Sequence, residues 1–474
     1  MNLNFRVTTL LTATLALLMM AVPLQAGPST LPQKSPAVPG SFADVSGVYV
    51  IDLATGEVIT DINGARPFIP ASVTKAVTTA SVLCLKDSAE RFVTPVAALG
   101  KIKNGVLEGN IVVSCTGDPT IESRHMGGVR GFADSIAAGV KALGINRVKG
   151  RIIIDEAEMG PCDIPSGWMD EDLTEKYGAE LFGANYGDNI TVLSLPACTT
   201  SPATPGLEIE KAPGKRLSLK RDRHSRKLKL TGTAGKSRSM TIANPLPCST
   251  MEAAVKSKLA DAGIAVEGAD IKPSNHTELI YTHVSPRYVD IMRSLMVRSD
   301  NLYAEGMLRT LAPGEKRQEA IAEELDIWTD NEVNLHGVIL EDGSGLSRSN
   351  RLTPRFLAEV LEWMAESLVA PSYVRLFPTV GREGTVRNFL KGTPLEGRMV
   401  LKTGSMRGVQ SYAGYKLDEY GTPTHAVVVM CNNFKCDRGK LRATIKDVLM
   451  EIFAPEANPQ EGYAPESEDE QITD

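Results

Sequence analysis

The sequence "FIPASVTKAVTTASVL" (Phe68–Leu83) places a serine and a lysine three positions apart where a helix begins. Pro70 suits the start of a helix, and the apolar residues that follow have helical spacing. Ser72 and Lys75 therefore share one helix face. A serine becomes a nucleophile when a nearby base takes its proton, and a desolvated lysine can be that base. A capping serine beside a solvated lysine is the alternative, because Ser-x-x-Lys also occurs by chance.

Two later segments supply groups that fit the same chemistry. The segment "VRSDNLYAE" places Ser299-Asp300-Asn301 on a later helix, and "VLKTGSM" places Lys402-Thr403-Gly404-Ser405 at the end of an apolar strand. Ser72 is the only serine in the sequence that has a lysine three residues later. Ser-x-x-Lys, Ser-Asp-Asn and Lys-Thr-Gly in this order match the motif set of penicillin-binding proteins and class A β-lactamases.

Over most of the mature chain, the sequence resembles the class C low-molecular-mass penicillin-binding proteins, which are D-alanyl-D-alanine carboxypeptidases and endopeptidases. Three segments carry the resemblance beyond the motifs: "TGDPT" (Thr116–Thr120), "EDGSGLSRSNRLTP" (Glu341–Pro354) and "GSMRGVQSYAGY". The resemblance implies an α+β fold with a serine β-lactamase/DD-peptidase-like domain, in which helices flank an antiparallel sheet, and with inserted β-rich domains. It implies no metal and no organic cofactor.

The resemblance also implies roles for five catalytic residues. Ser72 attacks the carbonyl of the penultimate D-alanine and forms an acyl-enzyme, and Lys75 takes the serine proton. Ser299 helps to relay that proton to the leaving amine, while Asn301 holds the substrate amide. Lys402 adds positive potential near the nucleophile and the substrate carboxylate. Water then releases the acyl group, whereas a β-lactam that mimics D-Ala-D-Ala leaves a long-lived adduct.

The strand motif is expected to bind the end of the substrate. By resemblance, Thr403 and Ser405 hydrogen-bond the terminal carboxylate beside Gly404, and the backbone N–H groups of Ser72 and Ser405 form the oxyanion hole. Arg407 stands where some relatives carry a neutral amide, so the substrate preference is expected to differ.

Some family members recognise the free end of a diamino acid in the stem peptide. By resemblance, Arg348 in "GLSR" would take its carboxylate, and Asp172, followed by Tyr177 in "GWMDEDLTEKY", would take its ammonium. Asp170 or Glu171 can replace Asp172 in this alignment. Exposed charges and a packing tyrosine are the structural alternative.

The domain organisation follows from the order of patterns. We predict a signal peptide at 1–26, the first part of the peptidase domain at 27–88, inserted domains at 89–275, its second part at 276–454, and a disordered acidic tail at 455–474. A β-hairpin is predicted at "SGVYVIDLATGEVITDING", strands at "GRMVLKTGSMRGVQSYAGYKLD" and "THAVVVMCNNF", and a closing helix at "GKLRATIKDVLMEIFA". The two ends of the chain are expected to close one domain around the insertion.

A strongly basic segment at 211–238 has the period of an exposed hairpin with a polar tip at Arg221–Arg226. A solvated hairpin, or one that faces an anionic envelope polymer, is the favoured interpretation. A nucleic-acid partner is not predicted, because the net charge is -6 and the segment lacks aromatic residues for stacking.

The N-terminus predicts export to the periplasm. One arginine precedes an apolar run from Val7 to Val22, and "LQA" ends in a cleavage site after Ala26. A retained anchor, and hence a loose membrane association, stays open. In an exported protein the seven cysteines permit disulfides, and Cys431 and Cys436 are spaced to close a local loop.

The predicted substrates are peptidoglycan stem peptides, with β-lactams as covalent inhibitors; the oligomeric state stays open. A β-lactamase of the same superfamily is one rival, but the chain has a long insertion and lacks a Glu-x-x-Leu-Asn-like element to activate water. A non-catalytic cell-wall-binding scaffold is the other, and the intact motifs argue against it.

Overall fold

The computed structural model describes residues 40–455 except 161, 224, 233–236 and 273–274. The predicted signal peptide at 1–26 and the predicted acidic tail, apart from Pro455, lie outside the described residues. Within the described part of the chain, no helix is long and apolar enough to cross a membrane.

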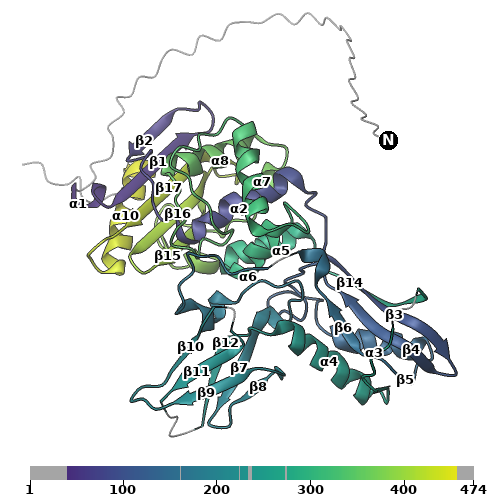
Figure 1. Ribbon diagram of the computed structural model, residues 1–474. Helices are drawn as coiled ribbons and strands as arrows, with labels where there is room; N and C mark the ends of the chain where they lie inside the picture. Colours follow the sequence, from purple (N-terminus) through teal and green to yellow (C-terminus); the bar gives the residue numbers. More distant parts are fainter. Residues whose placement is uncertain (1–39, 161, 224, 233–236, 273–274, 456–474) are drawn as a thin grey trace, which may run out of the picture. The chain divides into compact units, whose positions relative to one another are not determined.

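One antiparallel sheet joins the two ends of the described chain, with the strand order β15-β16-β17-β1-β2 (Figure 1). Its strands are β1 (Ser46–Asp52), β2 (Val58–Ile62), β15 (Met399–Met406), β16 (Val409–Leu417) and β17 (Pro423–Asn432). β1 pairs with β2 on one side and with β17 on the other. The predicted hairpin and the predicted sharing of one sheet by the two ends are thus confirmed.

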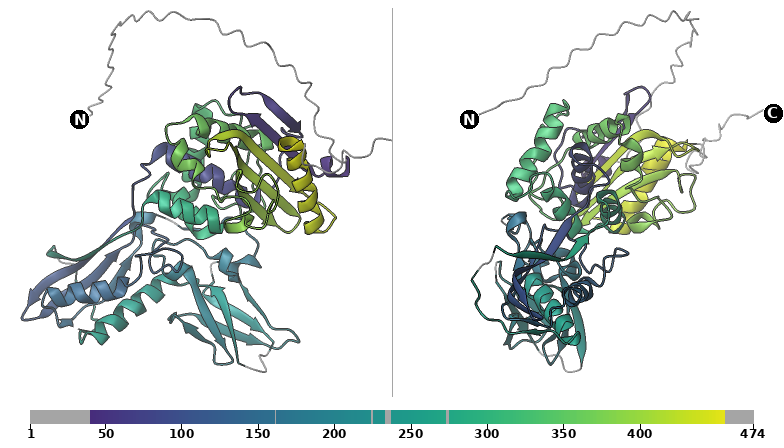
Figure 2. Two further views of the ribbon diagram at one scale, coloured as in Figure 1. Left: turned by 180° about the vertical axis from the view of Figure 1, so that it is seen from behind. Right: turned by 90° about the vertical axis from the view of Figure 1, so that its right-hand side faces the viewer.

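Helices cover both faces of this sheet (Figure 2). They are α1 (Gly40–Ala43), α2 (Thr74–Leu85), α5 (Tyr288–Arg298), α6 (Asn301–Arg309), α7 (Arg317–Asp330), α8 (Pro354–Glu366), α9 (Ala370–Val374) and α10 (Arg438–Phe453). Successive side chains of a strand point to opposite faces. Val48 and Val50 therefore join the core beneath α10, whereas Tyr49 and Ile51 join the core shared with α2 and α8.

The first part of the inserted region is a six-stranded sheet with two helices. Its strands are β3 (Val93–Lys103), β4 (Val106–Ser114), β5 (Arg147–Val148), β6 (Ile152–Asp155), β13 (Ala265–Val266) and β14 (Thr277–Val284), and its helices are α3 (Phe132–Ala142) and α4 (Pro247–Asp261). β14 pairs with β3. This pairing favours an end of the inserted region after Val284 instead of the predicted 275, and the domain boundaries remain a proposal.

The second part contains two three-stranded sheets that share a small apolar core. One has β7 (Ile190–Leu195), β8 (Thr199–Ser201) and β12 (Arg238–Ala243), and the other has β9 (Glu208–Ala212), β10 (Ser218–Arg221) and β11 (Lys227–Thr231). β10 and β11 form the predicted basic hairpin. The prediction of an exposed tip is wrong at Arg221 and Arg223. Arg221 is buried and pairs with Glu180, and Arg223 is bonded to the protein backbone.

All seven cysteines lie among the described residues, and all are free thiols. Cys431 is buried in β17, whereas Cys436 is exposed beyond the end of that strand. The local loop suggested by their spacing is therefore not closed by a disulfide.

Candidate active site

Ser72 lies in a 3₁₀ turn, Ala71–Val73, that leads directly into α2. The prediction of a helix start is confirmed. Ala71 has a positive φ of 50°, a conformation that residues other than glycine rarely adopt. Such backbone outliers persist only where the surrounding structure enforces them. The turn leaves Ser72 half-buried, at the edge of a cavity.

Lys75 is fully buried, and its ammonium nitrogen lies at the centre of the site. Nζ is 3.1 Å from Ser72 Oγ, 2.6 Å from Asn301 Oδ1 and 2.5 Å from the Ser344 carbonyl oxygen. Burial lowers the pKa of Lys75 to about 8, although the nearby carboxylates of Asp342 and Glu305 act against this shift. A lysine in this state can accept a proton near neutral pH.

The Ser299-Asp300-Asn301 motif occupies a break between two helices, so its predicted position on one helix is wrong. Ser299 ends α5 in the left-handed conformation, with φ 61° and ψ 41°. Asp300 caps α6, because its side chain accepts a hydrogen bond from the backbone N–H of Tyr303. Asn301 is then the first residue of α6, and its amide bridges Lys75 and the carbonyl oxygen of Tyr177 (2.8 Å).

Lys402 lies on β15 and is also fully buried. Its Nζ donates to Ser299 Oγ at 2.8 Å and to the carbonyl oxygen of the adjacent Thr403 at 2.7 Å. Burial, and then the charge of Lys75, hold the pKa of Lys402 well below its ordinary value. Two buried lysines therefore share the site, and each is hydrogen-bonded to one of the two motif serines.

Gly404 allows β15 to approach the nucleophile. A Cβ at this position would lie 2.5 Å from the Pro70 carbonyl oxygen and 3.1 Å from the backbone nitrogen of Ser72. Real Cβ atoms do not occupy such positions without a shift of the backbone. The motif Lys-Thr-Gly thus requires a glycine at 404, because β15 passes too close to the backbone of Pro70 and Ser72 for a side chain to fit.

A cavity of about 370 Å³ opens in front of Ser72. Its lining residues are Ser72, Met169, Asp172, Tyr177, Ser299, Asn301, Gly345, Leu346, Arg348, Ser405, Met406 and Arg407. Most of the predicted site residues therefore face one space, and Lys75, Lys402 and Gly404 support it from behind. Thr403 is not among the lining residues, and its hydroxyl donates to Thr385 at 2.7 Å.

The predicted diamino-acid residues lie along the same cavity. Tyr177 OH donates to Asp172 Oδ1 at 2.8 Å, and Arg348 Nη2 donates to the Arg407 carbonyl oxygen at 2.7 Å. Asp170 instead pairs with Arg223, and it does not line the cavity. The geometry therefore favours Asp172 over Asp170 as the candidate acidic group.

A second cavity of about 400 Å³ continues from the first, because Tyr177, Ser299 and Asn301 line both. Its wall also carries three basic residues, Arg124, Lys176 and Arg298, and two acidic ones, Asp188 and Asp300. The cleft therefore extends past the nucleophile into a space lined by charged residues of both signs.

Sequence reasoning missed the buried groups behind Lys75. The residues of "DGSG", Asp342–Gly345, form a tight turn in which Asp342 Oδ1 accepts the Gly345 N–H at 2.8 Å. The Ser344 carbonyl oxygen of this turn is a direct partner of Lys75. Glu305 accepts the Ser344 N–H at 2.9 Å, and its burial raises its pKa to about 7. No sequence motif marks Asp342, Ser344 and Glu305 as site residues. They belong to the site only because the folded chain brings this turn next to α2.

Comparison with known proteins identifies the family of the chain. Residues 30–452 match the D-Ala-D-Ala carboxypeptidase 3 (S13) family. The D-alanyl-D-alanine carboxypeptidase DacB of Haemophilus influenzae is 26% identical over 403 residues, which are 79% of this chain and 83% of that protein. A D-alanyl-D-alanine carboxypeptidase of an Actinomadura species is 26% identical over 437 residues, 81% of this chain and 76% of that protein.

Solved structures show the same fold. Penicillin binding protein 4 from Haemophilus influenzae has a TM-score of 0.73 and 25% identity, covering 86% of this chain and 96% of its own. A predatory peptidoglycan endopeptidase from Bdellovibrio bacteriovorus has a TM-score of 0.51 at 15% identity, covering 88% and 93%, which supports the fold alone.

The site and the family match define a serine peptidase with a penicillin-binding-protein fold. The chain belongs to the D-Ala-D-Ala carboxypeptidase 3 (S13) family. The predictions of a class C low-molecular-mass penicillin-binding protein, of its α+β fold class and of serine carboxypeptidase chemistry are confirmed.

The close approach at Gly404 gives a first testable prediction. Gly404→Ala pushes β15 away from Ser72, and we expect acylation by benzylpenicillin to slow by about 10²-fold or more, since one lost oxyanion donor costs that much. Stopped-flow or quenched mass spectrometry measures the rate.

The control is Gly421→Ala in the turn between β16 and β17. A Cβ on Gly421 meets nothing within 4 Å, although this glycine has a positive φ of 88°. The control is therefore expected to lose some stability and keep its acylation rate. Equal rates in Gly404→Ala and wild type would refute the role of the close approach.

Proposed function

We propose that this chain hydrolyses D-Ala-D-Ala and related bonds of peptidoglycan stem peptides through an acyl-enzyme on Ser72. The observation that carries the proposal is the 3.1 Å contact between Ser72 Oγ and the buried Nζ of Lys75. The family match supports the same chemistry.

Acylation follows from the surroundings of Lys75. A neutral amine donates its two protons to Asn301 Oδ1 and the Ser344 carbonyl oxygen, so its lone pair is left for Ser72 Oγ. The serine proton moves to Nζ as Oγ bonds to the carbonyl carbon of the penultimate D-alanine. The bond from this carbon to the leaving nitrogen then breaks, and the nitrogen takes up a proton.

Ser299 and Lys402 are proposed to return that proton. Lys402 Nζ donates to Ser299 Oγ at 2.8 Å, and Ser299 faces the cavity that holds the scissile bond. Asn301 would hold the substrate amide, as its side chain lines the same cavity. Water then attacks the acyl carbon, the bond to Oγ breaks, and Ser72 regains its proton.

The oxyanion is proposed to bind the backbone N–H groups of Ser72 and Ser405. The approach of Gly404 to the Ser72 nitrogen brings these two backbone segments together. The terminal carboxylate would bind at Ser405 and Thr403, near the buried Nζ of Lys402. The Thr403 hydroxyl is bonded to Thr385 in the free enzyme, so it must exchange that partner for the substrate.

Asp172 and Arg348 are proposed to bind the ammonium and the carboxylate of a diamino-acid side chain. Both line the cavity of Ser72, and Tyr177 fixes the Asp172 carboxylate through one of its oxygens. The other oxygen and the N–H groups of Arg348 that do not bind the Arg407 carbonyl oxygen are proposed to bind a zwitterionic group.

An endopeptidase activity is supported by the second cavity. It adds about 400 Å³ to the cleft, and Arg124, Lys176 and Arg298 on its wall suit the carboxylates of a second stem peptide. We therefore propose that the enzyme admits cross-linked substrates as well as pentapeptide ends. We also propose, from the predicted signal peptide at 1–26, that it works in the periplasm.

Trapping the acyl-enzyme tests the proposal. We expect intact-mass spectrometry after addition of benzylpenicillin to show a persistent gain of one penicillin mass in wild type and none in Ser72→Ala. The Haemophilus protein was solved in complex with a β-lactam, which supports this expectation. A transient adduct with consumption of the drug would favour a β-lactamase. No adduct on folded protein, together with no release of D-alanine from a pentapeptide, would favour a scaffold.

The lowered pKa of Lys75 predicts the pH dependence. Only the neutral amine accepts the serine proton, so kcat/KM should rise about tenfold per pH unit below about pH 8 and level off above it. In Glu305→Gln the rise should move to lower pH, because a negative charge that raises the lysine pKa is removed. The measurement is a pH profile of acylation or of D-alanine release.

Glu319→Gln serves as the matched control, because Glu319 is an exposed carboxylate of α7. Its profile should overlay that of the wild type. A flat profile between pH 6 and pH 9 in the wild type would contradict the assignment of Lys75 as the base.

A further inference from the structure

Residues 163–178, which we call the cleft loop, carry Asp172 and Tyr177 to the cavity. Their only regular structure is two 3₁₀ turns, Asp172–Thr174 and Lys176–Gly178. Backbone carbonyls outside helices and strands need other hydrogen-bond partners when they are buried. The position of the loop therefore depends on side chains supplied by other segments.

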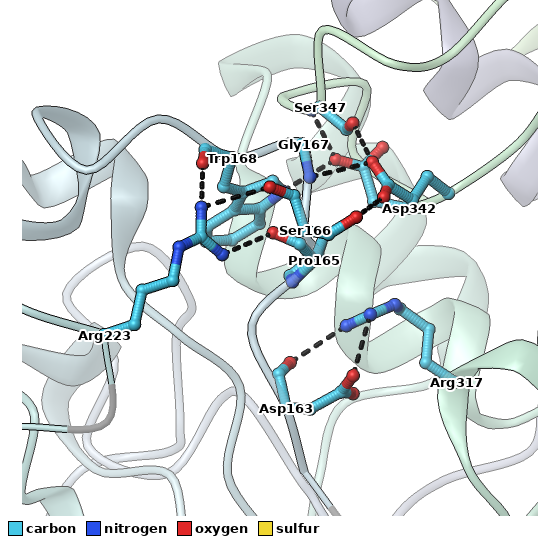
Figure 3. Close-up of polar contacts among 10 residues, drawn as sticks. Asp163, Pro165, Ser166, Gly167, Trp168, Arg223, Arg317, Asp342 and Ser347 are labelled. Carbon is cyan, nitrogen blue, oxygen red and sulfur yellow. Dashed lines mark hydrogen bonds and ion pairs between the residues drawn. The ribbon is translucent and has the colours of Figure 1, made fainter.

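The peptidase domain holds one side of the cleft loop. Trp168 is 2% exposed, and its indole nitrogen donates to Asp342 Oδ2 at 2.8 Å. The backbone N–H of Gly167 donates to Glu341 Oε2 at 3.0 Å, and a Cβ on Gly167 would lie 2.1 Å from Ser347 Oγ. At the start of the loop, Arg317 binds both the carbonyl oxygen and the carboxylate of Asp163 (2.9 Å each) (Figure 3).

The inserted hairpin holds the other side through Arg223. Figure 3 shows its guanidinium directed at the backbone of the loop. Nη1 donates to the Pro165 carbonyl oxygen at 3.0 Å, and Nη2 donates to the carbonyl oxygens of Ser166 (3.2 Å) and Trp168. Nε pairs with Asp170 Oδ1 at 3.1 Å. All three guanidinium nitrogens thus bind the cleft loop.

We infer that Arg223 is a positioning residue for substrate selection, which fixes Asp172 and Tyr177 by clamping the cleft loop from the inserted hairpin. The inference rests on the proposed recognition of a diamino-acid side chain by Asp172. Asp170, which Arg223 binds, lies two residues before Asp172, so the clamp ends next to the proposed ammonium site.

The geometry requires an arginine. A planar guanidinium reaches several acceptors at once, whereas a lysine ammonium is a single point of charge. The Arg223 side chain is 28% exposed; its bonds to Pro165 and Trp168 are partly buried, whereas those to Ser166 and Asp170 are exposed. Hydrogen bonds to a charged donor contribute more to stability than neutral ones do. Losing the clamp should loosen the loop without unfolding the domain.

The catalytic centre contacts the cleft loop through Asp342, which binds Trp168, and through Asn301, whose amide donates to the Tyr177 carbonyl oxygen. We expect little effect on the reaction of Ser72, because Asn301 keeps its contact with Lys75 and Asp342 has further partners. Asp342, which binds Trp168 and lies behind Lys75, also accepts the N–H groups of Gly345 (2.8 Å) and Ser347 (2.6 Å) and the amide of Asn350 (2.6 Å). These donors belong to the peptidase domain and keep the turn in place when the cleft loop moves. Arg223 is therefore expected to affect the selection of substrate and not the reaction of Ser72.

The experiment compares two D-Ala-D-Ala peptides that differ only in the diamino-acid side chain, which is free in one and N-acetylated in the other. For Arg223→Ala we expect the preference in kcat/KM for the free peptide to fall about 3- to 10-fold through KM. The kcat for the acetylated peptide and the benzylpenicillin acylation rate should stay within about twofold of wild type. Arg223→Lys should recover part of the preference. Lys220→Ala, an exposed change on the same hairpin, should retain all of it.

Asp172→Asn separates this inference from the proposed function. A loss of preference in both Asp172→Asn and Arg223→Ala supports the inference. A loss in Asp172→Asn alone overturns it and leaves the proposed recognition intact. No loss in Asp172→Asn overturns the proposed recognition and the inference with it. An equal fall of penicillin acylation in Arg223→Ala would show a general structural role and would overturn the inference as well.

Hydrogen exchange supplies a readout of the loop itself. Peptides from residues 163–178 should exchange faster in Arg223→Ala than in wild type, and peptides from β7 should not change. Unchanged exchange in the loop would contradict the clamp. If Arg223→Ala does not fold, the two peptides are compared with Arg223→Lys and Asp170→Asn, each of which retains part of the clamp.

Discussion

The burial of Lys75 is the constraint on which the rest of the site depends. A lysine ammonium is costly to remove from water unless its protons are bonded, and burial favours the neutral amine. Asn301 and the Ser344 carbonyl oxygen satisfy two of its donor positions, and Ser72 lies at the third. Each of these partners comes from a different segment. The helix start, the break between α5 and α6, and the turn before Gly345 must therefore converge on one nitrogen before the serine has a base.

This convergence explains why strained or glycine-only positions surround the nucleophile. Ala71 and Ser299 adopt left-handed conformations beside the catalytic groups. Gly404 and Gly345 allow backbone to approach backbone; a Cβ on Gly345 would lie 2.0 Å from the Ala71 carbonyl oxygen. Local strain of this kind is retained where geometry has a function. The segments that carry Gly404 and Gly345 thus meet the turn of Ser72 through backbone contacts, which side-chain motions disturb little.

Sequence reasoning found the groups that act through side chains in contiguous motifs, because Ser-x-x-Lys and Lys-Thr-Gly each encode local spacing on a helix or a strand. It misplaced Ser299, because a serine in the left-handed conformation gives no signal for a helix break. It could not choose between Asp170 and Asp172, because the direction of each side chain is set by the fold of the loop. It read Arg223 as solvated, because the partners of Arg223 are mostly carbonyl oxygens, which every residue has.

The division of contacts around the cleft loop separates catalysis from selection. The turn behind Lys75 is bonded chiefly within the peptidase domain, whereas the loop that carries Asp172 is bonded on both sides, to that domain and to the insertion. Changes in the hairpin can therefore alter which side chain the cleft accepts, and the bond from Asn301 to the Tyr177 carbonyl oxygen is the direct contact between the loop and a partner of Lys75. An insertion that leaves the catalytic motifs unaltered thus gains influence over the substrate through one arginine, because irregular backbone adopts the position that its donors impose.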